Sequence, residues 1–171
     1  MHSIELKHTT TASPEKLWLA LTDPKYSRQW DGNRWGQNDA CVGGQLRART
    51  EEGTLFTAEI LIYDVCERLA VLAQVPVNPE EPEEGTYTIR QEFTLEPQQG
   101  KTTLHVKFTG FPDESSATMM RNTWGGFYLE KIGKVAESVS EKDVAQFSRP
   151  IALGNDFPGD VRHTELATIL R

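Results

Sequence analysis

Five aromatic side chains and two arginines are the residues of this chain best suited to hold a small molecule. Most of the aromatic residues gather in a polar stretch that follows residue 30 and in a late helical segment, and both arginines lie on strand-like segments. Aromatic walls with a few polar anchors are the ordinary lining of a small-molecule site. Each aromatic residue could instead be an ordinary core residue, and that alternative stays open. The predicted ligand contacts are Trp30, Trp35, Arg49, Tyr63, Arg90, Trp124 and Tyr128.

Acid–base catalysis is a second possibility, because a few titratable groups lie on the predicted strands and the late helix. They are Glu59, Glu92, His105 and Arg121. Glu59 lies on an otherwise apolar predicted strand, so it is either a buried functional acid or an edge residue in water. The chain has neither a Gly-x-Ser-x-Gly nucleophile motif nor a phosphate-binding loop. We therefore assign no catalytic residue.

Cysteines and histidines form no recognisable ligand pattern in this sequence. Cys41 and Cys66 stand alone, and isolated cysteines are usually small buried hydrophobic residues. The four histidines show none of the spacings that bind zinc. The sequence therefore predicts no metal site and no cofactor.

Composition narrows the classes of partner. The chain has 171 residues and a formal net charge of -7, which argues against binding to a nucleic-acid backbone. No apolar run is long enough to predict a membrane span. The first residues have neither a basic nor an apolar signal region, so we expect a cytoplasmic location.

Alternating apolar and polar residues predict about six strands. Short turns separate the later strands, and short turns favour antiparallel pairing. Between the first two strands, Ser13-Pro14-Glu15 is typical of a helix start, since serine caps and proline suits the first helical position. The predicted strands cover residues 4–9, 45–50, 54–64, 68–75, 86–95 and 102–109.

A long amphipathic helix should follow the last strand, beginning near Asp113 to Ser116. Its apolar residues recur with the 3.6-residue helical period. Gly125-Gly126 interrupts it, which indicates either a close backbone approach to the sheet or a ligand, or a tolerated kink. One antiparallel sheet that buries one long helix belongs to the α+β class.

Five motifs in this order resemble the START-like, or SRPBCC, superfamily. They resemble most closely the branch named after the activator of the ninety-kilodalton heat-shock chaperone ATPase. The resemblance covers roughly residues 3 to 138. The motifs are Thr11–Pro24 followed by Trp30, Val42–Arg47, Asp64–Leu69 with Val65-Cys66 in place of two prolines, Gly100–Leu104, and Trp124–Leu129.

This resemblance implies a helix-grip fold, in which a curved antiparallel sheet of about six strands surrounds a long C-terminal helix. It also implies an internal cavity for a small hydrophobic ligand, and this is the function we expect. Two alternatives remain open: an enzyme of the cyclase or dehydratase type, and a protein-interaction module like the chaperone activator. We expect a helix-grip domain at residues 1–139 and a C-terminal extension at 140–171, through which a homodimer could form.

Overall fold

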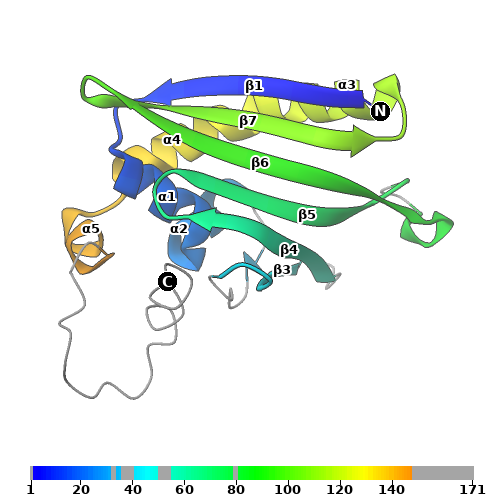
Figure 1. Cartoon of the computed structure of the whole chain (residues 1–171), viewed down its shortest axis with the longest axis horizontal. Helices are drawn as coiled ribbons and strands as arrows, with labels where there is room; N and C mark the ends of the chain where they lie inside the picture. Colours follow the sequence, from blue (N-terminus) through cyan, green and yellow to red (C-terminus); the bar gives the residue numbers. More distant parts are fainter. Residues whose placement is uncertain (1, 32–33, 36–40, 50–54, 79–80, 148–171) are drawn as a thin grey trace, which may run out of the picture.

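The described part of the chain forms one curved antiparallel sheet with its helices on one side (Figure 1). The computed structural model describes residues 2–31, 34–35, 41–49, 55–78 and 81–147. The strands are β1 (His2–Thr10), β2 (Arg34–Trp35), β3 (Gln45–Arg49), β4 (Leu55–Asp64), β5 (Arg68–Pro76), β6 (Thr86–Gln98) and β7 (Lys101–Phe111).

Strand order follows from short connections. Within the described ranges the order is β1-β7-β6-β5-β4-β3-β2, and every neighbouring pair is antiparallel. Strands β2 to β7 thus form a meander, and β1 adds to its far edge beside β7. Six of these strands have five or more residues, and β2 has two. The predicted α+β helix-grip fold is confirmed.

The helices start where the sequence predicts. Ser13 caps α1, its side chain accepting a hydrogen bond from the Lys16 backbone N–H, with Pro14 in the first turn. Asp113 caps the long helix in the same way, accepting from the Ser116 N–H at 2.8 Å. The helical elements are α1 (Pro14–Thr22), α2 (Pro24–Asp31), the 3₁₀ turn η1 (Pro82–Glu84), α3 (Glu114–Thr123), the π-helical turn η2 (Trp124–Tyr128), α4 (Leu129–Ser138) and α5 (Glu141–Phe147).

The long helix is a continuous run of α3, η2 and α4 that packs along β1 and β7. Of its three glycines, Gly133 is the one packed tightly against the sheet, since an added Cβ would lie 2.6 Å from His8 Nε2. The Gly125-Gly126 pair is not a point of close approach. A Cβ on Gly125 would make an ordinary 3.6 Å contact with Leu6, and one on Gly126 would meet nothing. Both glycines lie in the π-helical turn.

The register gives the sheet two chemically different sides. Directly opposed residues of neighbouring strands share a side. The side that packs on the helices, here the helix-facing side, carries apolar residues such as Phe93, Val106 and Phe108. The opposite side, here the outer face, carries ion pairs such as Arg90–Glu92 at 3.1 Å and Lys107–Glu5 at 2.7 Å. The outer face is therefore a charged, hydrated surface.

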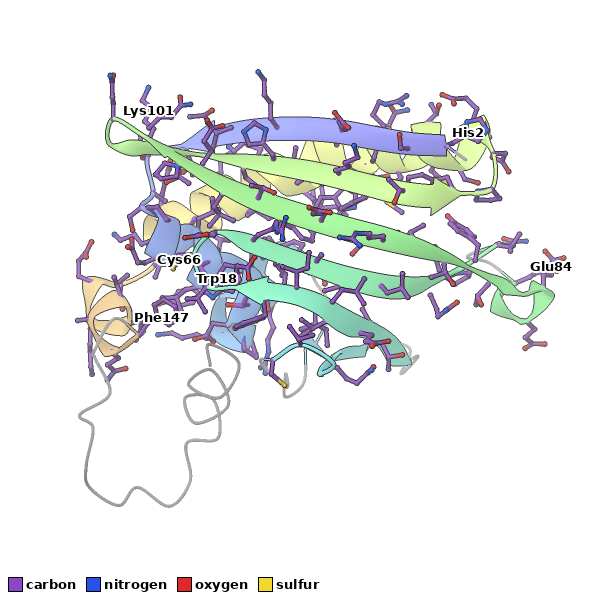
Figure 2. All side chains as sticks on the ribbon, in the orientation of Figure 1. His2, Trp18, Cys66, Glu84, Lys101 and Phe147 are labelled. Carbon is purple, nitrogen blue, oxygen red and sulfur yellow. The ribbon has the colours of Figure 1, made fainter. Side chains whose placement is uncertain are left out.

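Helix α5 is the described part of the predicted C-terminal extension, and it packs back onto the domain. Val144 and Phe147 are partly buried against the hydrophobic core. Figure 2 shows Phe147 at the same end of the molecule as Trp18, far from His2 and Glu84. Residues 148–171 lie outside the described part of the chain, so most of the predicted extension does too.

A carboxylate at Asp143 holds α5 against α2. Its Oδ2 accepts hydrogen bonds from Lys25 Nζ at 2.6 Å and from the Tyr26 hydroxyl, and the Ser140 hydroxyl accepts from the Asp143 N–H. Lys25, followed by Tyr26 and Ser140, holds the pKa of Asp143 well below its usual value of 3.8. A lowered pKa in the folded state stabilises the fold above the unfolded-state pKa, and this contribution is lost as the pH falls through the folded-state pKa.

We therefore expect Asp143→Asn to loosen α5 at neutral pH, and acidification below about pH 4 to do the same in the unchanged protein. Amide hydrogen exchange should then be faster in α5 and unchanged in β6 and β7. Lys142→Gln, on the same helix, is the matched control and should leave exchange unaltered. Equal α5 exchange in Asp143→Asn and the unchanged protein would show that this carboxylate does not hold the helix.

Candidate ligand-binding site

Three of the predicted contact residues meet in one aromatic cluster. The ring centroids of Trp30 and Trp124 are 6.0 Å apart, as are those of Trp30 and Tyr128. Trp124 and Tyr128 are 5.3 Å apart. Beneath them, Trp124 contacts Phe108 at 4.8 Å and Phe93 at 5.7 Å. These five residues form the aromatic cluster, which joins α2 and η2 to the helix-facing side of β6 and β7.

Local structure fixes how these rings lie. The Trp30 indole N–H donates a 2.8 Å hydrogen bond to the Ala20 carbonyl, which ties α2 to α1 and orients the ring. Trp124 and Tyr128 mark the two ends of the π-helical turn. Such turns are rare and occur often at functional sites. Burial, followed by the nearby Asp31 carboxylate, raises the pKa of Tyr128, so its hydroxyl is neutral at physiological pH.

The structure places the other predicted contacts elsewhere. Tyr63 packs edge-to-face on Trp18, with ring centroids 5.0 Å apart. Trp35 and Arg49 lie in the backbone of β2 and β3, where Trp35 pairs with Ala48 and Arg49 with Leu55. Their side chains are outside the described part of the structure.

Arg90 lies on the wrong side of the sheet to be a polar anchor beside the aromatic cluster. It is opposite Thr109 and Leu72 in the register, and its guanidinium donates to Glu92 on the outer face. We therefore leave Arg90 out of the candidate site. The physical reason is the two-residue period of a strand, which sends Arg90 and its neighbour Gln91 to opposite sides.

Gln91 is the polar residue that the sequence analysis missed. It pairs with Val71 on β5 and Phe108 on β7, both buried on the helix-facing side. Its side chain is partly exposed, so its amide is accessible to solvent. The sequence does hold a signal for it, since Gln91 falls in phase with the apolar residues Ile89 and Phe93. The alternation of side chains along β6 therefore predicts that the Gln91 amide lies on the helix-facing side.

Beyond the aromatic cluster, the helix-facing side is only partly covered. Leu46 pairs with Ala58, Ala58 with Ala73, and Val75 with Tyr87, so these side chains are neighbours across β3 to β6. All five are partly buried and still accessible to solvent. We call them the open apolar surface. It lies next to Ile89 and Gln91 on β6, and Gln91 in turn adjoins Phe108 of the aromatic cluster.

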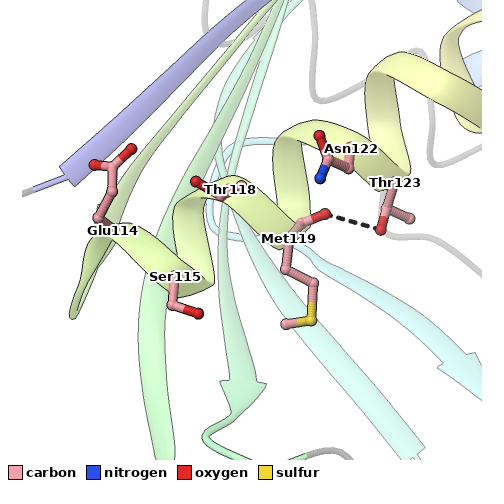
Figure 3. A pocket seen from close by; sticks show the side chains of 6 residues that line it. All are labelled: Glu114, Ser115, Thr118, Met119, Asn122 and Thr123. Atoms are coloured by element: carbon pink, nitrogen blue, oxygen red, sulfur yellow. Dashed lines mark hydrogen bonds between the residues drawn. The ribbon is translucent and has the colours of Figure 1, made fainter.

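At the aromatic cluster, the described residues do not form the internal cavity that we expected between the long helix and the sheet. Trp124, Phe93 and Phe108 are at most 7% exposed, so side chains fill the space between helix and sheet at the aromatic cluster. A hollow of about 510 Å³ does lie along α3 (Figure 3). It is on the side of the helix opposite to the buried Ala117 and Trp124, so it is a surface hollow. Its lining is Glu114, Ser115, Thr118, Met119, Asn122 and Thr123.

The groups considered for acid–base chemistry are dispersed. Glu59 is exposed on the outer face, where it pairs with Gln45 and Leu72 in the register. His105 bonds Glu96 at 2.8 Å on the same face. Arg121 lies 3.9 Å from Glu114 on α3. Glu92 is held by Arg90, so Glu59, Glu92 and His105 lie on the outer face, whereas Arg121 lies on the helix.

Comparison with known protein families identifies the family of this chain. Residues 11–137 match the model of the family described as activator of Hsp90 ATPase homolog 1-like protein. The chain belongs to this family. The match spans α1 to α4, and so it contains the aromatic cluster and the open apolar surface. No protein with a curated description matches the chain at a significant level.

Solved structures show the same fold at low sequence identity. Protein MLL2253 from Mesorhizobium loti aligns with a TM-score of 0.66 at 22% identity, over 81% of this chain and 99% of its own. CalU16 from Micromonospora echinospora aligns with a TM-score of 0.62 at 19% identity, over 85% of this chain and 82% of its own. The Aha1 dimer from Colwellia psychrerythraea aligns with a TM-score of 0.60 at 21% identity, over 78% of this chain and 99% of its own.

None of the helices in the described ranges combines the length and apolar composition needed to cross a bilayer.

Proposed function

We propose that this protein binds a small apolar molecule on the helix-facing side of its sheet. The ligand would lie on the open apolar surface, with the aromatic cluster as its end wall. The observation that carries the proposal is the set of solvent-accessible apolar side chains, Leu46, Ala58, Ala73, Val75 and Tyr87, beside a buried cluster of rings. Apolar walls with a few polar groups are typical of small-molecule sites.

Two small residues at the centre of this surface support the proposal. Ala58 and Ala73 are directly opposed on β4 and β5, and their small side chains are partly exposed to solvent. Burial, followed by the nearby Asp113 carboxylate, raises the pKa of Tyr87. The Tyr87 hydroxyl on the open apolar surface is therefore also neutral at physiological pH. A neutral, apolar surface favours a neutral, apolar ligand, because charges lose solvation there.

We expect Ala58→Phe to weaken binding of a neutral fluorescent probe, N-phenyl-1-naphthylamine, by about tenfold or more, since a lost contact of roughly 1.4 kcal/mol is a factor of ten. The phenyl ring would occupy the space above Ala73. Titration of probe fluorescence measures the affinity. Thr57→Phe is the matched control, because Thr57 is exposed on the same strand and points to the other side of the sheet.

The proposal fails if both variants bind the probe as the unchanged protein does, or if the protein binds no neutral apolar probe at all. Circular dichroism and the thermal midpoint of each variant would separate a lost site from a lost fold.

Family membership favours a second candidate function, the protein-interaction role of a chaperone activator. Capture of the Hsp90 chaperone by the full chain, together with stimulation of its ATPase activity, would support this role. The outer face carries paired charges rather than an apolar patch, so such a partner would meet polar groups there.

We also propose the narrower organisation expected from the sequence: a helix-grip domain at 1–139, an extension at 140–171, a cytoplasmic location, and a homodimer through the extension. The dimeric relative from Colwellia psychrerythraea supports the dimer. The contacts of α5 with its own domain compete with that use of the extension, because they occupy its first helix. The mass of the full chain in solution tests the dimer.

A further inference from the structure

Gln91 is a polar group on a side of the sheet that is otherwise apolar around it. Its register partners Val71 and Phe108 are 2% and 0% exposed. Its neighbours two positions away on β6, Ile89 and Phe93, are buried as well. An amide in such surroundings normally finds a hydrogen-bond partner, since leaving one unmade costs free energy. The Gln91 side chain is partly exposed, so its amide is accessible to water or to a polar group of a ligand.

Charge on these strands is confined to the outer face. On β4 to β7 the register sends every described charged side chain away from the helices, including Glu59, Arg68 and Lys107. Several are paired there, as Arg68 is with Asp64 at 3.5 Å. The environment of Gln91 therefore offers one amide donor and acceptor, with no opposite charge from these strands to compensate an ionised ligand.

Resting on the proposed function, we infer that Gln91 selects the ligand: a neutral molecule with an apolar body and one hydrogen-bonding group, such as a ketone, amide or hydroxyl. The apolar body covers Ala73 and Val75, and the polar group meets the Gln91 amide beside the aromatic cluster. A site built to hydrogen-bond a ligand group rejects the analogue that lacks it, because the protein amide then remains unpaired. A carboxylate is rejected because it loses solvation there and gains no ion pair from β4 to β7.

Three probes of nearly equal shape test this inference: fluorene, 9-fluorenone and fluorene-2-carboxylate. We expect the unchanged protein to bind fluorenone about three- to tenfold more tightly than fluorene, the factor that one hydrogen bond supplies. The carboxylate should bind more weakly than either. Binding is measured by quenching of tryptophan fluorescence and checked by calorimetry.

Gln91→Leu and Gln91→Met replace the amide with an apolar side chain of similar size. In both variants we expect the preference for fluorenone to disappear while fluorene binds as before or more tightly. Gln74→Leu is the matched control, because Gln74 lies on the outer face, where it bonds Thr88 at 2.9 Å. It should keep the preference.

The outcomes separate the two claims. Equal binding of fluorene and fluorenone by the unchanged protein, or a preference that survives in both Gln91 variants, overturns the role of Gln91 and leaves the proposed function standing. Binding of none of the three probes overturns the proposed function, and this inference with it. Tighter binding of the carboxylate than of fluorenone overturns the inferred neutrality of the ligand.

Discussion

Replacing Trp124 with alanine is expected to lower the free energy of unfolding by about 3–5 kcal/mol, the usual range for a buried tryptophan. Trp124 is 7% exposed and contacts Trp30, Phe93, Phe108 and Tyr128. Its loss removes this buried area and leaves a void between helix and sheet that the surrounding rings can fill only in part. Urea denaturation, followed by circular dichroism, measures the change.

Phe127→Ala is the matched control for Trp124→Ala. Phe127 is in the same π-helical turn, is 52% exposed and lies beneath Lys131, whose Nζ is 4.4 Å from the ring centroid. We expect its removal to change stability by no more than about 1 kcal/mol. Similar losses for the two variants would mean that Trp124 does not anchor the helix to the sheet.

Gly110→Ala is the second change with a large expected effect, a loss of roughly 2–4 kcal/mol. Gly110 has a φ of 108°, which side-chain-bearing residues rarely adopt. An added Cβ would also lie 2.5 Å from the Thr88 carbonyl oxygen on β6. Because that atom is backbone, relief requires the β6–β7 pairing to shift. The thermal midpoint and the urea midpoint should both fall.

Gly126→Ala is the matched control, because it replaces a glycine with alanine at a position where no backbone strain or clash is expected. Gly126 lies in the π-helical turn without a positive φ, and a Cβ there would meet nothing within 4 Å. We expect a neutral or slightly stabilising change, because alanine favours helices over glycine by up to about 1 kcal/mol. If Gly110→Ala is as well tolerated as Gly126→Ala, the packing of β7 on β6 is not as tight as described.

Local rules made much of the fold predictable. Ser13 and Asp113 cap helices because their side chains accept backbone hydrogen bonds, and both do so here. The strands follow from alternation of apolar and polar residues, and the meander follows from short turns. Trp30, Trp124 and Tyr128 were named as candidate ligand contacts, and the structure brings their rings together.

Features that depend on the relation between distant segments were less accessible. The prediction of Arg90 as a ligand contact followed residue type and did not consider strand phase, which sends Gln91 to the helix-facing side. Gly125-Gly126 left close approach and a kink equally open, since the sequence does not show that Gly133, rather than this pair, packs tightly against a residue of the sheet. Whether rings fill the space under a helix depends on side-chain packing across four elements, which no local pattern specifies.

Methyl-resolved NMR of the alanine residues, recorded with a bound neutral probe, tests the central claim most directly. Ala58 and Ala73 lie on the open apolar surface, whereas Ala70 pairs with Glu92 on the outer face and Ala145 is on α5. We predict intermolecular Overhauser effects from N-phenyl-1-naphthylamine to the Ala58 and Ala73 methyl groups and none to Ala70 or Ala145. Effects confined to Ala70 or Ala145, with Ala58 and Ala73 unperturbed, would contradict a binding site on the helix-facing side.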